Sequence, residues 1–217
     1  MHVASWTVII PIKAPAVGKS RLRGAPADDR VVLAIALDTV AAALASDAVA
    51  RVLVVTSDEA VADAVSTLGA STVRDPAGGG LNRSIAAGAA HAGHAVARAA
   101  LLADLPALRG EELTAALGAI HGTAGRAYVP DHTGTGTTLL GALPGINLDP
   151  RFGPGSADAH ASSGAIRLRG DWPGLRLDVD TAADLIAARE LGLGGHTSAA
   201  LGEPGRGRAP GAMRVVG

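Results

Sequence analysis

Two segments of the chain end in carboxylates at positions that suit a magnesium site. The apolar run at residues 99–106 reaches Asp104 and then a proline, which stops the strand. A second run, residues 175–181, places Asp178 and Asp180 two residues apart, so both would project from one face of a strand. Ligands of open α/β sheets sit in the crevice at the carboxyl ends of the strands. Three carboxylates converging there would form a hard oxygen site for Mg²⁺, which leaves its other positions to water and substrate phosphate.

Each acidic segment also has a simpler interpretation. A single aspartate after a strand, such as Asp104, is commonly a helix N-cap or a turn former. The acids at residues 178–180 lead into residues 182–185, and they could instead belong to a helix cap with a charged first turn. The presence of both segments in one chain favours the metal site.

A basic loop is expected at residues 13–24, after the first strand. Gly18 and Lys19 look like the end of a Walker phosphate-binding loop, but that pattern needs a glycine five residues earlier, where Lys13 stands. The cations still lie at the carboxyl end of a strand, where they would meet nucleotide phosphates. They are Lys13, Lys19, Arg21 and Arg23. A solvated basic loop is the alternative.

Three consecutive glycines at residues 78–80 allow the backbone to approach a ligand closely. Asn82 follows them, near the start of a helix expected to run to about residue 97. Its side chain could cap this helix or present its amide to a base or ribose, and the two roles are compatible. His91 and His94 have metal-ligand spacing on the same helix, but no third ligand is evident, which favours a solvated helix face.

Two further loops are rich in glycine and hydroxyl groups. Residues 133–138 offer backbone N–H and hydroxyl donors in close quarters, which suits an anion. Residues 151–156 repeat this composition, and Ser156 opens a helical stretch toward Ser163, so a phosphate could sit at a helix N-terminus. Each loop alone is weak support for an anion site.

The elements that would position these residues alternate between strands and helices. Strands are expected at residues 6–12, 51–56, 71–74, 99–104 and 125–131, and helices at 28–45, 58–68, 81–97 and 110–121. This order is typical of a mainly parallel α/β sheet with helices on both faces.

Composition limits the function classes. The 217 residues suggest one domain, residues 1–201, followed by a Pro- and Gly-rich tail, residues 202–217, that is expected to be disordered. No cysteine is present, which excludes disulfides, thiolate catalysis and cysteine zinc sites. A net charge of −1 and only 2% aromatic residues give no sign of a nucleic-acid or anionic-membrane partner. With no basic leader and no long apolar run, a cytoplasmic location is expected.

Together these motifs resemble the guanylyltransferases of coenzyme F420 biosynthesis, nucleotidyltransferases with a nucleotide-diphospho-sugar transferase (glycosyltransferase-A-like) fold. The resemblance covers nearly the whole chain up to the tail. It rests on residues 10–13, 18–22, 80–82, 103–106, 136–138, 152–153, 155–156 and 177–181. No departure from the family pattern removes a proposed ligand.

The resemblance implies transfer of GMP from GTP to a small phosphorylated acid. The acceptor is phosphoenolpyruvate in the bacterial enzymes and 2-phospho-L-lactate in the archaeal ones, and the Ala-, Gly- and Arg-rich composition favours the bacterial form. Handover of the product to a downstream F420 transferase would follow, while the oligomeric state stays open. A nucleotide-binding module that regulates a partner without turnover is the alternative from another class.

The resemblance also assigns roles residue by residue. The expected Mg²⁺ ligands are Asp104, Asp178 and Asp180, and the expected phosphoenolpyruvate ligands are Thr138, Gly153 and Ser156. Lys13, Lys19, Arg21 and Asn82 would bind the nucleotide, with Lys19 and Arg21 also assisting catalysis by neutralising charge.

Overall fold

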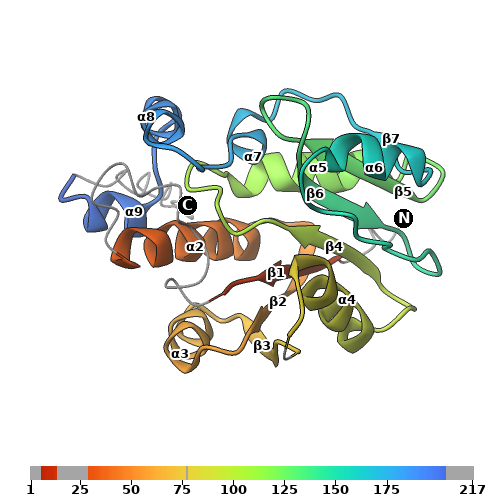
Figure 1. Ribbon diagram of the computed structural model, residues 1–217, viewed down its shortest axis with the longest axis horizontal. Coiled ribbons are helices and arrows are strands. Elements are labelled where there is room, and N and C mark those ends of the chain that lie inside the picture. Colours follow the sequence, from red (N-terminus) through yellow and green to blue (C-terminus); the bar gives the residue numbers. More distant parts are fainter. Residues whose placement is uncertain (1–5, 14–28, 77, 204–217) are drawn as a thin grey trace, which may run out of the picture.

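The computed structural model describes residues 6–13, 29–76 and 78–203, and their backbone forms one mixed seven-stranded sheet (Figure 1). The strand order is β3-β2-β1-β4-β6-β5-β7. The strands are β1 (Trp6–Pro11), β2 (Val49–Thr56), β3 (Ser71–Arg74), β4 (Ala97–Leu101), β5 (Arg126–Pro130), β6 (Thr137–Ala142) and β7 (Ile166–Arg167). Strand β6 is antiparallel to both of its neighbours, and the other four pairs are parallel. The expected mainly parallel α/β sheet is therefore confirmed.

Helices cover both faces of the sheet. They are α2 (Asp29–Leu44), α3 (Glu59–Thr67), α4 (Leu81–Ala92), α5 (Gly110–Ile120), α6 (Ser156–Ser162), α7 (Pro173–Arg176), α8 (Ala182–Leu191) and α9 (Gly195–Ala200). One core joins the sheet to α2, α3, α5 and α7, and a second core joins its other face to α4 and α6. A third, smaller core packs the C-terminal segment against α2. Figure 1 shows α2 and α4 on opposite sides of β1.

The central strand β1 is apolar because both of its faces are covered. All six of its residues are buried, as expected for a central strand in a sheet with helices on both sides. Helix α4 approaches this strand closely at Gly88. A Cβ atom at Gly88 would lie 2.5 Å from Cγ2 of Ile9 and 2.9 Å from Cγ2 of Val55. The small residue therefore sets the distance between α4 and the sheet.

The helix expected at residues 81–97 is shorter than predicted. It ends at Ala92, because Gly93 adopts a φ of 88° at the C-cap and leaves the helix. Strand β4 then begins at Ala97, two residues earlier than the predicted strand. His91 and His94 consequently do not share a helix: His91 lies on α4, and His94 lies in the connection to β4.

The strand predicted at residues 175–181 is wrong. Leu175 and Arg176 belong to the short helix α7, which begins at Pro173 because proline fits the first helical position. Residues 177–181 are irregular and lie outside the sheet. The alternation that suggested a strand is still real, since Leu177 and Val179 are buried in the third core.

Two sequence expectations lie outside the described residues. They are the basic loop beyond Lys13, with Lys19, Arg21 and Arg23, and the tail from residue 204 onward. Among the helices that are described, none has the length and apolar character needed to cross a membrane.

Candidate active site

Acidic side chains gather at the carboxyl ends of β4 and β5. Asp104 follows β4 by three residues, and Asp131 follows β5 directly. The irregular segment after α7 lies against the first of these ends, because the Val179 N–H donates to the Asp104 carbonyl at 2.9 Å. This single backbone contact brings Asp178 and Asp180 to the same edge. We call Asp104, Asp131, Asp178 and Asp180 the acidic edge.

Asp178 is the most perturbed member of the acidic edge. Burial is the main cause that raises the pKa of its carboxyl to about 6, and the charges of Asp104, Asp180 and Asp131 contribute to the same shift. Its Oδ1 atom is buried and has no hydrogen-bond partner among the described residues, although Nδ1 of His132 lies 3.5 Å away. A buried carboxylate surrounded by like charges is favourable only when a cation compensates it.

The helix-cap interpretation of residues 178–185 is confirmed in part, because this segment forms the N-terminal cap of α8 with an acidic first turn. Thr181 is the N-cap of α8, and its hydroxyl accepts from the Asp184 N–H while the Asp184 carboxylate accepts from the Thr181 N–H. Capping of α8 is therefore carried by Thr181 and Asp184 rather than by the acids at 178 and 180. Asp104 does not cap α5, whose N-cap is Arg109.

The oxygen chemistry of the acidic edge fits Mg²⁺, but the side chains do not form a closed cage. Carboxylate oxygens are the ligands that this hard cation prefers. Within residues 6–13, 29–76 and 78–203, no three acidic or histidine side chains are grouped closely enough to hold an ion by themselves. The assignment of Asp104, Asp178 and Asp180 as metal ligands stays a prediction.

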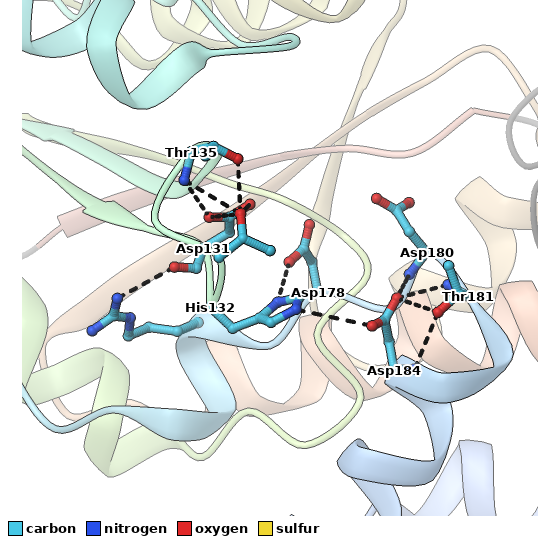
Figure 2. Close-up of polar contacts among 9 residues, drawn as sticks. Asp131, His132, Thr135, Asp178, Asp180, Thr181 and Asp184 are labelled. Carbon is cyan, nitrogen blue, oxygen red and sulfur yellow. Dashed lines mark hydrogen bonds and ion pairs between the residues drawn. The ribbon is translucent and has the colours of Figure 1, made fainter.

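The hydroxyl-rich loop at residues 132–136 is folded around Asp131 (Figure 2). Oδ1 of Asp131 accepts from the Thr135 N–H at 3.0 Å, and both carboxylate oxygens accept from the Thr133 hydroxyl at 3.0 Å. Gly136 is required here, because a Cβ atom would lie 2.5 Å from Oδ2 of Asp131. The anion that the donors of this loop bind is thus the chain's own carboxylate.

His132 lies between Asp178 of the acidic edge and Asp184 of α8. Figure 2 shows its ring between Asp178 and Asp184, with Nδ1 3.5 Å from Oδ1 of Asp178 and Nε2 4.0 Å from Oδ1 of Asp184. Sequence reasoning assigned no role to Asp131 or His132. An apolar strand ending in proline and aspartate, as at Pro130 and Asp131, is a signal related to the one that pointed to Asp104.

The predicted acceptor residues lie on two neighbouring segments. Thr138 is on β6, its carbonyl accepts from the Leu102 N–H at 3.0 Å, and its buried hydroxyl has no hydrogen-bond partner among the described residues. Gly153 has a φ of 141°, which disfavours other residues, and its carbonyl accepts from the N–H of the buried Ser156. Ser156 begins α6, as the sequence predicted.

His160 connects these acceptor segments and was not identified from the sequence. Its Nε2 accepts from the Arg151 N–H at 2.9 Å, so Nδ1 carries the proton and donates to the Thr137 hydroxyl at 2.9 Å. Burial lowers the pKa of His160 to about 4, with the Arg126 charge as the next cause. The ring packs edge-on against Phe152. No sequence motif marks it, because its role depends on contacts between distant segments.

Two predicted nucleotide-binding residues are engaged within the chain. Lys13 donates from Nζ to the Gly79 carbonyl at 3.0 Å, which joins the end of β1 to the glycine-rich segment. The Asn82 amide donates to the Phe152 carbonyl at 2.9 Å and accepts from the Phe152 N–H at 2.7 Å. The N-cap of α4 is Gly80 rather than Asn82. Asn82 therefore joins α4 to the segment 152–156, which we call the acceptor segment because it contains Gly153 and Ser156. Its contact with a nucleotide stays a prediction.

Comparison with known proteins identifies this architecture. Residues 25–152 match the model of the MobA-like NTP transferase domain. Among solved structures, a putative nucleotide-diphospho-sugar transferase from Desulfovibrio desulfuricans has a TM-score of 0.62 at 17% identity, covering 84% of this chain and 85% of its own. A nucleotidyl transferase from Methanothermobacter thermautotroptrophicus has a TM-score of 0.62 at 18% identity, covering 86% and 96%. The family model therefore places the chain in the MobA-like NTP transferase class, and the solved structures share its fold.

Curated relatives narrow this class. The phosphoenolpyruvate guanylyltransferase of Salinispora arenicola is 54% identical over 91% of this chain and 94% of its own length. The enzyme of the same name from Geodermatophilus obscurus is 54% identical over 94% of this chain and 97% of its own. The chain belongs to the phosphoenolpyruvate guanylyltransferase family, as the sequence motifs predicted.

Proposed function

We propose that the protein transfers GMP from GTP to phosphoenolpyruvate, giving enolpyruvyl-diphospho-5'-guanosine and pyrophosphate. The observation that carries this proposal is the half-buried carboxyl of Asp178, whose pKa is raised by its burial and by the charges of Asp104, Asp180 and Asp131. Such an arrangement needs a cation and anionic substrates to balance it. The family relationship supplies the identity of the acceptor.

The reaction is an in-line displacement at the α-phosphorus of GTP. A phosphate oxygen of the acceptor forms the new bond, the bond from the α-phosphorus to its β-bridging oxygen breaks, and pyrophosphate leaves with that electron pair. The acceptor phosphate is already ionised at neutral pH, so no general base is required. The main barrier is repulsion between two anions, which positioning and positive charge must overcome.

Different residues of this chain are proposed to position the two substrates and to neutralise their charge. Thr138, Gly153 and Ser156 are proposed to hold the carboxylate and phosphate of the acceptor. Lys13, Lys19 and Arg21 are proposed to neutralise the phosphates of GTP, with Lys19 and Arg21 also assisting catalysis, and Asn82 is proposed to contact the nucleoside. Asp104, Asp178 and Asp180 would hold Mg²⁺, which when bound supplies charge neutralisation and orientation of the phosphates.

The test measures pyrophosphate release from GTP and Mg²⁺ with each of two acceptors. Because the product is unstable, the assay is coupled to the downstream F420 transferase. Release with phosphoenolpyruvate and not with 2-phospho-L-lactate is expected. Release only with 2-phospho-L-lactate would keep the reaction and reverse the acceptor. Binding of GTP without release under either condition would instead favour a regulatory nucleotide-binding module.

The pathway assignment is part of the same proposal. Synthesis of coenzyme F420 would use the product directly, and its short lifetime makes handover to the next transferase advantageous. Because GTP and phosphoenolpyruvate are intracellular metabolites, the proposed reaction takes place in the cytoplasm. No nucleic-acid or membrane partner is needed for it.

A further inference from the structure

Two arginines, Arg98 and Arg126, lie at the edge of the sheet opposite the acidic edge. A pocket of about 640 Å³ is lined there by residues from α4, the starts of β4 and β5, and the segment 147–150. Arg98 is the second residue of β4 and Arg126 the first residue of β5, whereas Asp104 and Asp131 follow the other ends of these strands. The pocket is therefore separate from the acidic edge.

Arg98 is the unusual residue of this pocket. It is 4% exposed, and its Nη2 donates a hydrogen bond to the Ile146 carbonyl at 2.6 Å. Its Nε atom is buried and has no hydrogen-bond partner among the described residues. Burial also lowers the pKa of Arg98. A buried guanidinium is normally compensated by an anion, because desolvation of an unpaired charge is costly.

The carboxylate of Asp149, which also lines the pocket, forms ion pairs with other arginines and not with Arg98. Oδ2 of Asp149 lies 3.4 Å from Nη1 of Arg126 and 3.1 Å from Nη2 of Arg151, so two other arginines share it. Within the described ranges, no ion pair joins Arg98 to an acidic side chain. The pocket thus keeps an excess of positive charge.

The remaining walls suit a small organic anion. Oδ1 of Asn147 lies 3.0 Å from Nε2 of His94, which leaves the amide N–H₂ of Asn147 available as a donor beside the pocket. Helix α4 contributes Ala86, Ala89 and Ala90 to the lining, and their small side chains leave room for an apolar body. Guanidinium and amide donors facing an apolar wall are a typical arrangement for recognising a carboxylate or phosphate head group.

We propose that this pocket binds a small oxyanion, a carboxylate or a phosphate monoester, through Arg98, at a site distinct from the acidic edge. The bound anion joins α4 to the segment 147–150. Helix α4 also bonds Phe152, two residues beyond this segment, through Asn82, so the pocket is close along the chain to the predicted acceptor residues Gly153 and Ser156. This inference does not depend on the proposed reaction.

The test follows the Nε–H resonance of Arg98 in the full chain labelled with ¹⁵N-arginine, assigned by its loss in Arg98→Lys. Inorganic phosphate and propionate are titrated separately, with chloride as the ionic-strength control. A saturable shift with phosphate alone assigns the phosphate class, and one with propionate alone assigns the carboxylate class. A saturable shift with both ions shows that the site accepts either oxyanion. If the resonance responds to neither ion beyond the chloride control, the site does not exist.

Two variants locate the binding. Ala90→Glu places a carboxylate at the exposed wall of the pocket and should weaken the apparent affinity at least tenfold, while Arg51→Met, which removes an arginine outside the pocket, should leave it unchanged. Equal affinity in Ala90→Glu and the parent would overturn the assignment. Asp104→Asn should lose turnover and keep the Arg98 response, so failure of the proposed reaction and failure of this site give different results.

Discussion

The side chain of Asp178 serves the proposed reaction at the expense of folding stability. Partial burial, followed by the charges of three nearby carboxyls, raises the pKa of its carboxyl to about 6 from an ordinary value of 3.8. Between these two values the folded chain holds a proton that the unfolded chain has lost. Stability must therefore fall as the pH rises from about 4 to about 6, in the absence of a bound cation.

Asp178→Asn should thus raise stability and abolish turnover. At pH 8 without Mg²⁺ we expect a gain of about 1 kcal/mol, well below the full value of the pKa shift because the site is partly solvated. At pH 4 the gain should disappear, since the carboxyl is then largely protonated in the parent. Thermal unfolding at both pH values, together with pyrophosphate release, measures the two effects.

Asp63→Asn is the matched control, because Asp63 is exposed on α3. It should change neither the unfolding temperature at pH 8 nor turnover. If the stability of the parent and of Asp178→Asn depends on pH in the same way, the pKa of Asp178 is not raised in the folded protein. Near-parent turnover in Asp178→Asn or in Asp104→Asn would remove these residues from the metal site.

The neutral His160 ring joins Thr137 to Arg151, so its removal should change the KM for the acceptor. His160→Ala removes two hydrogen bonds of 2.9 Å and a buried ring packed against Phe152. We expect a loss of about 3 kcal/mol in unfolding free energy and a raised KM for phosphoenolpyruvate, with the KM for GTP less affected. Urea denaturation and steady-state kinetics test this.

The lowered pKa of His160 predicts that His160→Ala also changes how the stability of the fold depends on pH. Because its folded value, about 4, lies below the ordinary 6.5, stability is present above pH 6.5 and is lost as the pH falls toward 4. His160→Ala should therefore flatten the acid limb of the stability curve. His91→Ala, an exposed histidine on α4, should leave that limb intact. An unchanged acid limb in His160→Ala would contradict the assignment.

At the scale of elements, the loop between β5 and β6 depends on a glycine. The 132–136 loop closes around Asp131, and Gly136 is the position where its backbone meets that carboxylate. This packing also joins the loop to α6, since the Ala157 N–H donates to the Thr135 carbonyl at 3.0 Å. The loop and the acceptor segment therefore form one unit.

Gly136→Ala should disrupt that unit. The added methyl would lie 2.5 Å from Oδ2 of Asp131, so the loop must shift, at a cost of about 1–3 kcal/mol and with reduced turnover. Gly118→Ala is the matched control, because Gly118 lies on α5 and a Cβ atom added there would meet nothing within 4 Å. It should raise stability by up to about 1 kcal/mol. Thermal unfolding of both variants should therefore give shifts of opposite sign, and shifts of the same sign would contradict the role given to Gly136.

At the scale of the whole molecule, the C-terminal segment is held by an aspartate near the beginning of the chain. Asp38 on α2 is 6% exposed and accepts from the His196 N–H at 2.9 Å and the Thr197 N–H at 2.8 Å. These bonds dock α9 on α2 and close the third core, which contains Leu177 and Val179. The position of Asp178, between these two residues, thus depends on a contact far away.

Asp38→Ala should cost about 2–4 kcal/mol, because it leaves the half-buried N–H of His196 and the buried N–H of Thr197 without their charged acceptor. Amide hydrogen exchange should show early loss of protection in α9 and in residues 177–181. Asp58→Ala, which removes the N-cap of α3, is a comparison on an element away from this core and should cost about 1 kcal/mol with no effect on α9. Unchanged protection of α9 in Asp38→Ala would overturn the proposed docking.

Some properties of this protein follow from the sequence alone. Strands 51–56 and 71–74 and the helix at 110–121 are found within two residues of their predicted ends, because local apolar periods and glycine or proline boundaries identify such elements. Asp104 is found beyond a strand end for the same reason. The family also follows from the sequence, because each of its motifs is a short local segment whose residues can be read without the fold.

Other properties were decided only by tertiary structure. The alternation at residues 175–181 predicted a strand, but packing of Leu177 and Val179 against α2 produces the same burial pattern outside a sheet. The raised pKa of Asp178, the bridging role of His160 and the buried charge of Arg98 all depend on distances between segments far apart in the chain. A single sequence records residue types and local spacing, whereas electrostatics and burial depend on which distant side chains become neighbours.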